Sequence, residues 1–259
     1  MKRDALLLYT VIGACTVIGY ALFHTYREHS IEAYGDAYTA VLVEPRLDMQ
    51  EATEFVLQNA LDNLSSAWNI IVFPGEENIG AVRTFVASLP PEKQSRITVQ
   101  DIGLKSMTIQ QYNDLMMSTR LLDVIPTEIF LVIQTDSIIC SSGKDLVNEF
   151  IKYDYVGAPW INWNTVGNGG FSLRRKSKML EVLGECPKLN HNEDGYFSGG
   201  CNDIQVSKPS AEEAQKFSVE TIYEGKQMFG VHKAWVYQSQ SMDDLESKCP
   251  GFKKIRDLN

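Results

Sequence analysis

The sequence predicts an α/β fold in which a mainly parallel sheet carries helices on both faces. Two observations support this class. Short apolar runs that end at turn residues, such as Trp68 to Phe73 and Ile129 to Ile133, have the length and composition of strands buried on both faces. Segments with the periodicity of amphipathic helices separate these runs. Strands that alternate with helices form parallel sheets, because each return to the same end of the sheet needs a crossover connection.

The first predicted strand and helix follow from local patterning. Tyr38 to Val43 is a short β-rich run, and Pro45 stops it. Asp48 and Glu51 have the spacing of a capping box. Small and apolar residues then recur every four positions from Ala52 to Leu64. We therefore expect a strand, a tight connection and a helix capped at Asp48.

The following elements alternate in the same way up to about residue 150. Pro74-Gly75 ends the strand that begins at Trp68, and Thr108 and Gln111 have capping spacing before another helix. The elements expected here are a helix around Ile79 to Leu89, a strand near Ile97 to Val99 and a helix that reaches about Leu122. After residue 150, short strands, glycines and aromatic residues replace the regular pattern, which is typical of a region built from loops.

The N-terminal residues have the pattern of a membrane anchor. An uncharged and largely apolar run extends from Ala5 to Phe23, and about 20 helical residues span a bilayer core. Lys2 and Arg3 precede the run, so the positive-inside rule places the N-terminus in the cytosol. We expect a cytosolic tip at 1–4, a transmembrane signal anchor at 5–23 and a short stalk at 24–36, as in a single-pass type II membrane protein. A cleaved signal peptide and a buried helix are the alternatives.

Charge and cysteine content limit the partners and the kinds of site. The formal net charge of −9 disfavours binding to nucleic acid, because an acidic chain repels its phosphates. None of the five cysteines forms a CxxC pair, which leaves a structural zinc site without support. We favour free and mostly buried thiols for Cys140, Cys186, Cys201 and Cys249, while pairing stays open if the domain is luminal. Asn63-Leu64-Ser65 is the one glycosylation sequon, which is weak evidence for a luminal setting.

Four segments carry side chains suited to chemistry. In the first, Gln134-Thr135-Asp136-Ser137 follows the most strand-like run directly, so Asp136 projects from a carboxyl end of the sheet, where ligands bind in such folds. A turn-forming role for Asp136 is the alternative. The second, Gly167-Asn168-Gly169-Gly170, is either a hairpin turn or a backbone that passes close to a ligand. The basic residues after it, Arg174 and Arg175, either hold an anion or are solvated.

The other two segments combine charge with aromatic residues. Glu193 and Asp194 stand just before the aromatic pair Tyr196-Phe197, with Gly195 in between. Acids in the first turn of a helix complement its dipole, and a carboxylate within reach of a hydroxyl can also act as a general base. Near the C-terminus, His232 and Lys233 lie on a glycine turn before Trp235. A lone histidine is more often structural than a ligand, so both roles stay open.

In this order the four segments resemble the GT-A glycosyltransferases. The chain from about Tyr38 to Trp235 is similar to an uncharacterised glycosyltransferase-like family that is common in large DNA viruses and fungi. The similar segments are Val43-Glu44-Pro45-Arg46, Trp68-Asn69-Ile70-Ile71, Gln134-Thr135-Asp136-Ser137 and Tyr155 to Trp160. The Gly-Gly-Phe-Ser-Leu-Arg and Glu-Asp segments are also similar to those of β-1,3-galactosyltransferase-like enzymes.

The resemblance implies a GT-A fold, which is Rossmann-like, and a catalytic domain over residues 37–240. Its nucleotide-sugar half would span about 37–150 and its acceptor half about 151–240, followed by a C-terminal tail at 241–259. The implied enzyme is hexosyltransferase-like and moves a sugar, with inversion, from a nucleotide-sugar donor to a hydroxyl of a glycan, protein or lipid acceptor. The catalytic domain would be luminal, as in the Golgi, or otherwise extracytoplasmic.

The resemblance also implies roles for individual residues. GT-A enzymes hold Mn²⁺ or Mg²⁺ with an Asp-x-Asp motif and often a C-terminal histidine, which correspond here to Asp136 and His232. Ile138 stands where the second acid would be and cannot ligate a metal. Asp194 matches the general base of inverting members, with Glu193 as the second candidate. The other donor-binding residues implied are Glu44, Arg46, Thr135, Ser137, Gly169, Gly170 and Lys233.

Two other functions stay open. A membrane-tethered pseudo-glycosyltransferase, which binds a carbohydrate or nucleotide sugar without catalysis, would explain Ile138, whereas Glu193, Asp194 and His232 favour an enzyme. A metal-dependent hydrolase would gather several carboxylates and histidines around its metal. The chain has four histidines, and two of them lie beside the predicted anchor, so the sequence gives little support to a hydrolase.

Overall fold

The structure is a computed structural model that describes residues 37–161, 165–188, 192–201 and 203–259. The predicted membrane anchor and stalk lie outside the described residues. None of the helices in the described part of the chain combines the length and the hydropathy that a bilayer crossing requires.

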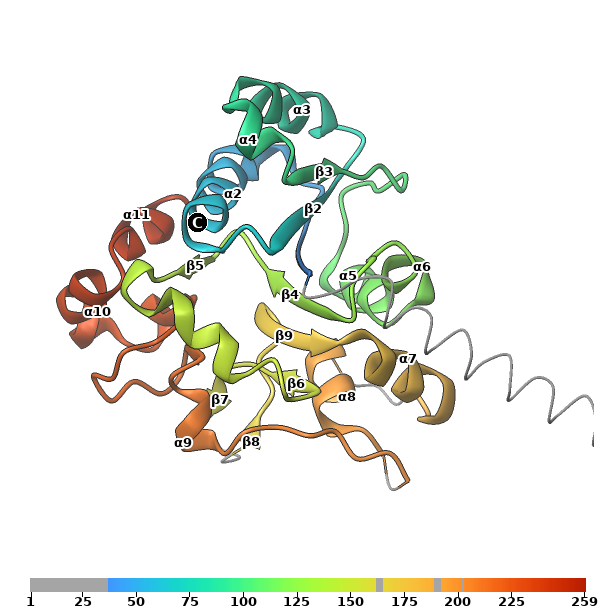
Figure 1. Cartoon of the computed structure of the whole chain (residues 1–259), viewed down its shortest axis with the longest axis vertical. Coiled ribbons are helices and arrows are strands. Elements are labelled where there is room, and N and C mark those ends of the chain that lie inside the picture. The colour runs from blue at the N-terminus through green and yellow to red at the C-terminus, as the bar shows by residue number, and fades with distance from the viewer. Residues whose placement is uncertain (1–36, 162–164, 189–191, 202) are drawn as a thin grey trace, which may run out of the picture. The chain divides into compact units, whose positions relative to one another are not determined.

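A six-stranded sheet in the order β3-β2-β1-β4-β9-β6 lies at the centre (Figure 1). Its strands are β1 (Tyr38–Glu44), β2 (Trp68–Pro74), β3 (Ile97–Val99), β4 (Ile129–Ile133), β6 (Tyr155–Val156) and β9 (Phe171–Arg175). β1 pairs in parallel with β2 and β4, and β2 with β3, whereas β9 runs antiparallel to β4 and β6. The predicted mainly parallel sheet is therefore confirmed, as are the four strands expected before residue 150.

Helices cover both faces of this sheet. Those that pack on it include α2 (Gln50–Asn63), α3 (Ile79–Ser88), α5 (Ile109–Met116), α6 (Thr119–Leu122) and α7 (Lys176–Glu185). Ala40 and Leu42 of β1 pack in one core with α2 and α3, whereas Val41 and Val43 pack in another with α5, α6 and α7. Because successive side chains of a strand point to opposite faces, apolar cover on both sides requires continuous apolar runs.

Two helix starts differ in how they are capped. Thr108 Oγ accepts a hydrogen bond from Gln111 N at 3.2 Å, and Gln111 Oε1 accepts one from Thr108 N at 2.8 Å, so the predicted capping box is confirmed. The helix that follows is split into α5 and α6 instead of continuing to Leu122. The predicted cap at Asp48 is wrong, because Asp48 lies within a 3-10 turn (Leu47–Met49) and α2 begins after it with no side-chain cap.

Two smaller sheets organise the loop-rich second half. One contains β10 (Ser218–Val219), β11 (Gly230–His232) and β5 (Ser137–Ile139), and the other contains β7 (Pro159–Trp160) and β8 (Thr165–Val166). β11 lies between its neighbours, parallel to β10 and antiparallel to β5, with His232 opposite Ser137. Because β5 follows β4 after a tight turn, this pairing delivers His232 to the carboxyl end of β4.

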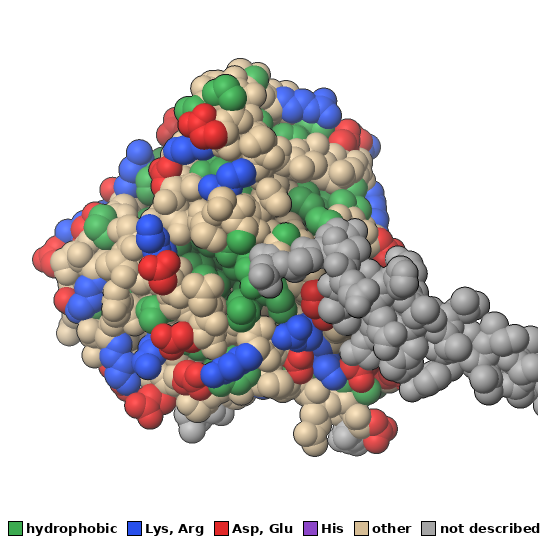
Figure 2. Space-filling model, viewed as in Figure 1, with side chains coloured by type: hydrophobic (Ala, Val, Ile, Leu, Met, Phe, Trp, Pro, Cys, Tyr) green, Lys and Arg blue, Asp and Glu red, His purple; other side chains and the backbone are tan. Residues whose placement is uncertain are grey.

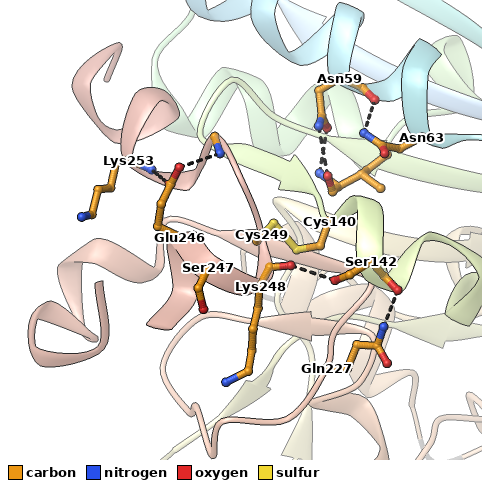
Figure 3. The surroundings of a disulfide bond; sticks show 12 residues. Asn59, Asn63, Cys140, Ser142, Gln227, Glu246, Ser247, Lys248, Cys249 and Lys253 are labelled. Atoms are coloured by element: carbon orange, nitrogen blue, oxygen red, sulfur yellow. Dashed lines mark hydrogen bonds between the residues drawn. A yellow bond between two sulfur atoms is a disulfide. The ribbon is translucent and has the colours of Figure 1, made fainter. Parts of the chain in front are cut away.

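The C-terminal residues are part of the folded core. Residues 241–259, the C-terminal tail expected from the sequence, form α10 (Met242–Lys248) and α11 (Phe252–Asp257). Phe252 and Ile255 are fully buried in the same core as α2. Glu246 accepts hydrogen bonds from the backbone N–H groups of Gly251 and Lys253, which holds the start of α11 (Figure 3). Burial of these apolar side chains keeps the segment on the domain.

The four cysteines within the described residues form two disulfides, so the favoured interpretation as free thiols is wrong. Cys140 is bonded to Cys249, and Cys186 to Cys201. The first bond joins the end of β5 to the end of α10 across 109 residues of sequence (Figure 3). The second joins the end of α7 to the segment after α8 (Glu193–Gly199), across 15 residues. The disulfides thereby cross-link β5 and the segment after α8, which adjoin candidate site residues, to α10 and α7.

Charged side chains of both signs are mixed on the surface. On the face that Figure 2 shows, acidic and basic side chains are interspersed, and hydrophobic side chains gather near the middle. Ion pairs such as Lys93–Asp62 and Lys253–Asp243 are accessible to solvent. Pairs of this kind contribute about 0–1 kcal/mol each. The fold therefore depends on its two apolar cores and on buried polar contacts.

Removal of the long-range disulfide should lower stability more than removal of the short-range one. Cys140→Ala with Cys249→Ala opens the longer loop, and loop-closure entropy predicts a loss of about 4–5 kcal/mol, against about 3 kcal/mol for Cys186→Ala with Cys201→Ala. Urea unfolding of the oxidised wild-type and paired variants measures both losses. An equal or larger loss for the second pair would contradict the expectation.

Candidate active site

The turn between β4 and β5 carries the acid that follows the central strand. Ser137 Oγ donates to Gln134 O at 2.7 Å and accepts from Gln134 N at 3.0 Å, which closes the turn. The side chain of Ser137, implied above to bind the donor, is thus engaged within the turn and buried. Lys233 N donates to Asp136 O at 2.9 Å. The Asp136 side chain keeps 18% of its surface exposed, so it is accessible to a ligand.

Three strand ends bring Asp136, His232 and Glu220 together. His232 Nε2 lies 3.2 Å from Asp136 Oδ1, and His232 Nδ1 lies 3.1 Å from Glu220 Oε1. The strand order β10-β11-β5 explains why Asp136, His232 and Glu220 form a row, since β11, which ends at His232, lies between β10 and β5. Glu220 was not among the site residues predicted from the sequence. The signal that pointed to Asp136, an acid directly after an apolar strand, is much weaker at Glu220 because β10 has only two residues.

The charges of this row influence one another. Burial alone would lower the pKa of His232, but the carboxylates of Asp136 and Glu220 raise it to about 9. Burial alone would raise the pKa of Asp136, but His232 and Lys233 hold it below its usual value. Lys233 adopts a left-handed conformation, with φ of 47°, and its Nζ lies 3.9 Å from Asp136 Oδ2. His232 and Lys233 therefore place positive charge beside Asp136, the more exposed of the two acids in this row.

Two glycines let this row approach α8. A Cβ on Gly170 would lie 2.2 Å from His232 Nε2. A Cβ on Gly169 would lie 2.3 Å from Glu193 Oε1 and 2.9 Å from Asp194 Cβ. Both glycines thus lie close to the protein's own side chains, which exclude any residue larger than glycine, whereas the approach predicted for this loop was to a ligand. This packing places Asp194 and His232 against two successive residues of one loop.

A buried ion pair fastens the glycine loop to the start of α8. Arg174 Nη1 and Nη2 donate to the Glu193 carboxylate at 2.6 and 3.0 Å, and Nη2 also donates to Gly169 O at 3.2 Å. Arg174 is 1% exposed and Glu193 4%. The expectation that Arg174 is solvated or holds a bound anion is wrong, because its anion is Glu193. Glu193 in turn is poorly suited to be a base, since a permanent cation occupies its carboxylate.

Asp194 keeps a carboxylate that can accept a proton. Gly195 N donates to Asp194 Oδ1 at 2.7 Å, and Asn113 Oδ1 accepts from Glu193 N at 3.0 Å, which fixes the first turn of α8. Burial and the charge of Glu193 raise the pKa of Asp194 to about 6. A carboxylate with a pKa near neutrality is suited to general base catalysis. Of the two acids implied for this role, the geometry favours Asp194.

A pocket of about 300 Å³ adjoins the Asp136 turn. It is lined by residues 43–46, 107–109, Tyr112 and 134–136. Glu44 is buried and accepts from Arg46 Nε and Nη2 at 2.8 and 2.6 Å. Four residues implied to bind the donor therefore meet here, namely Glu44, Arg46, Thr135 and Asp136. Tyr112 and Gln134, joined by a 2.9 Å hydrogen bond, also line the pocket and were not predicted.

The part of the chain that the structure describes contains no group of three or more His, Cys, Asp or Glu side chains that could hold a metal ion. Asp136 Oδ1 and His232 Nε2 are nevertheless buried atoms that lack a hydrogen-bond partner there. They lie 3.2 Å apart. Adjacent ligands of an octahedral cation lie about 3 Å apart, since each is about 2.1 Å from the metal. The pair thus fits two protein ligands of a divalent cation whose other ligands come from substrate and water.

Breaking the Arg174–Glu193 pair from one side should destabilise the domain strongly. Arg174→Met leaves the Glu193 carboxylate buried without its cation, and such changes cost about 3–5 kcal/mol. The double variant Arg174→Met, Glu193→Leu removes both charges and should recover much of the loss. Urea unfolding measures both, with Lys93→Met as an exposed control expected to change stability by about 1 kcal/mol or less. A loss for Arg174→Met no larger than the control's would contradict the expectation.

Solved glycosyltransferases share this fold. An active-site variant of LgtC matches with a TM-score of 0.50 and 9% identity over 85% of this chain and 94% of that chain. The bifunctional glycosyltransferase WbbM matches with a TM-score of 0.50 and 7% identity over 86% of this chain and 52% of its own. GlyE from Streptococcus pneumoniae matches with a TM-score of 0.43 and 14% identity over 67% of this chain, which spans 45% of that protein's chain. The two matches with a TM-score of 0.50 show a mixed α/β fold similar to GT-A proteins, as the sequence predicted.

Sequence comparisons add a family. No curated protein matches the chain. A family described as protein of unknown function, DUF5672, matches residues 96–232, which is just over half of the 259 residues. The matched segment includes Asp136, Arg174, Asp194 and His232. Its extent shows that this chain belongs to the DUF5672 family.

Proposed function

We propose that this chain is a glycosyltransferase that moves a sugar from a nucleotide-sugar donor to an acceptor hydroxyl. One observation carries the proposal: Gly169 and Gly170, successive residues of one loop, lie against the base candidate Asp194 and against His232, the partner of Asp136. The pocket beside Asp136 offers a place for the donor's nucleotide. The fold shared with glycosyltransferases supports the reaction class.

In the proposed reaction the acceptor oxygen attacks the anomeric carbon of the donor sugar. A bond forms between these two atoms, the bond from the anomeric carbon to the diphosphate oxygen breaks, and the hydroxyl proton passes to Asp194. A single displacement of this kind inverts the anomeric centre. With a pKa of about 6, Asp194 is ionised at neutral pH and still basic enough to accept the proton. Arg174 contributes by holding the preceding residue, Glu193, in place.

Positive charge for the departing diphosphate is available around Asp136. Lys233 carries a half-exposed ammonium group 3.9 Å from Asp136 Oδ2. Asp136 and His232 are the residues that would hold Mn²⁺ or Mg²⁺, and Mn²⁺ accepts imidazole more readily. Such a cation, when bound, neutralises negative charge on the leaving group. Glu44 and Arg46 line, together with Asp136, the pocket proposed for the nucleoside.

We place this activity at a membrane, as the N-terminal sequence predicts. The apolar run at 5–23 supports a signal anchor of type II topology with a luminal or other extracytoplasmic domain. Disulfides persist in oxidising compartments, so the two disulfides support the same setting. The acceptor is a glycan, a protein or a lipid. The formal net charge of −9 supports a role without nucleic acid.

A second candidate function rests on Ile138. This residue occupies the position of the second acid of the metal motif, and its side chain is buried in β5. A site with fewer acidic ligands could bind a nucleotide sugar without turning it over. The chain would then be a membrane-tethered pseudo-glycosyltransferase, in which the same pocket serves recognition alone.

Asp194→Asn should abolish transfer while donor binding persists. General base catalysis contributes about 10²–10⁴-fold, so kcat should fall by that factor with little change in KM for the donor. The full-length chain in detergent is incubated with a panel of nucleotide sugars, Mn²⁺ and candidate acceptors, and the released nucleoside diphosphate is measured.

Asp145→Asn, an exposed change in the 3-10 helix at Ser141–Glu149, serves as the matched control and should behave as wild type. Wild-type rates in Asp194→Asn would remove Asp194 from the mechanism. Donor binding without turnover by the wild-type chain would favour the pseudo-glycosyltransferase. A folded chain that neither binds nor turns over any donor would overturn both functions.

Transfer should also depend on pH through Asp194. The group accepts a proton only when ionised, so kcat/KM should fall by about tenfold per pH unit below a pH of about 6. Above that value the carboxylate is ionised and the profile should level off. Initial rates at constant ionic strength give the profile, and circular dichroism at each pH confirms that the fold is intact. A flat profile on the acid side would argue against Asp194 as the base.

A further inference from the structure

Glu220 lies on the side of His232 that faces away from Asp136. Its Oε1 is 3.1 Å from Nδ1, whereas Asp136 Oδ1 is 3.2 Å from Nε2. Glu220 is 8% exposed and His232 7%. Burying a carboxylate costs free energy unless a partner compensates. The proposed transfer reaction does not use Glu220, so the buried carboxylate must have another role.

Strand register explains how the row is held. Val219 of β10 pairs with Val231 of β11, and His232 pairs with Ser137 of β5. The next residue after Val219 is Glu220, so it leaves its strand end beside His232. Strands fix the backbone positions of their side chains more closely than loops do. Glu220 is therefore held against the imidazole by the same small sheet that holds the imidazole against the Asp136 turn.

We propose that Glu220 is a positioning residue that orients His232 as a ligand for a divalent cation. A carboxylate at Nδ1 keeps a proton on that nitrogen, so a cation that displaces the proton from Nε2 meets a lone pair directed toward Asp136 Oδ1. These two atoms are buried, lie 3.2 Å from each other and have no further hydrogen-bond partner within the described residues, as expected of a ligand pair. The inference rests on the proposed metal-assisted transfer and deepens it, because it names the residue that prepares one ligand.

The position of Glu220 favours orientation over direct ligation. The carboxylate contacts Nδ1, and the imidazole ring lies between that contact and the Nε2 side where Asp136 lies. Carboxylates that accept a hydrogen bond from the other nitrogen of a ligating histidine fix the ring and raise the basicity of the ligating nitrogen. Removing one typically weakens metal binding about 10–100-fold. Glu220 should therefore affect metal affinity without contacting the metal.

The test measures Mn²⁺ binding to the full-length chain by electron paramagnetic resonance, with and without UDP or GDP. We expect Glu220→Ala to raise the Kd for Mn²⁺ about 10–100-fold and Glu220→Gln to raise it less, because the amide oxygen can still accept from Nδ1–H. Glu213→Gln is the matched control and should leave the Kd unchanged, since that glutamate accepts a side-chain hydrogen bond from Tyr153, outside the row. Imidazole ¹H–¹⁵N spectra with Mg²⁺ report whether the His232 Nδ1 proton is held, and should change in the Glu220 variants alone.

Each outcome decides the inference. A Glu220→Ala protein with the wild-type Tm and a Kd within about twofold of wild type would overturn it, while leaving the proposed transferase intact. If Glu220→Ala does not fold, the nearly isosteric Glu220→Gln decides by its Kd and its imidazole spectrum, and wild-type values in both would overturn the inference. If the wild-type chain binds no Mn²⁺ with either nucleotide, the metal-assisted form of the proposed function fails and the inference fails with it.

Discussion

Arg174 extends from the central sheet to the first turn of α8, where it meets Glu193 with both side chains buried. The same guanidinium donates to Gly169 O and lies over the rings of Tyr155 and Phe197. One cation thus joins a strand, the glycine loop and the helix that carries the candidate base. Because an unpaired charge in this core would be costly, these elements are stable only when assembled together. The geometry of the candidate site depends on that assembly.

Contacts between residues far apart in sequence also hold β5 and the turn that carries Asp136. Asn59 of α2 accepts from Ile139 N and donates to Ile139 O, so a side-chain amide pairs with the backbone of β5 (Figure 3). The Cys140–Cys249 disulfide joins the end of β5 to the end of α10. Asn259 donates to Thr135 O, next to the acid of the turn. The C-terminal helices therefore brace the strand and turn that carry Asp136, although they lie far from it in sequence.

The buried carboxylates of the candidate site suit catalysis but lower the stability of the fold. Burial and Glu193 raise the pKa of Asp194 to about 6, which means that its charged form is disfavoured in the fold. Its contribution to stability is present at low pH and is lost as the pH rises through about 6. Glu220 is a further buried carboxylate, held against the imidazole of His232. Such groups gather at functional sites, where surrounding structure compensates for their cost.

Local patterns in the sequence determined the α/β class, the strands β1 to β4 and the capping box at Thr108. Burial on both faces requires continuous apolar runs, and a cap forms among residues three positions apart. The sequence also marked the acid after β4, because a strand end is a local feature. Only the tertiary structure decided that Arg174 pairs with Glu193 and that His232 lies beside Glu220. Strand order and register select these partners, and residue types along the chain do not encode which buried charges will meet.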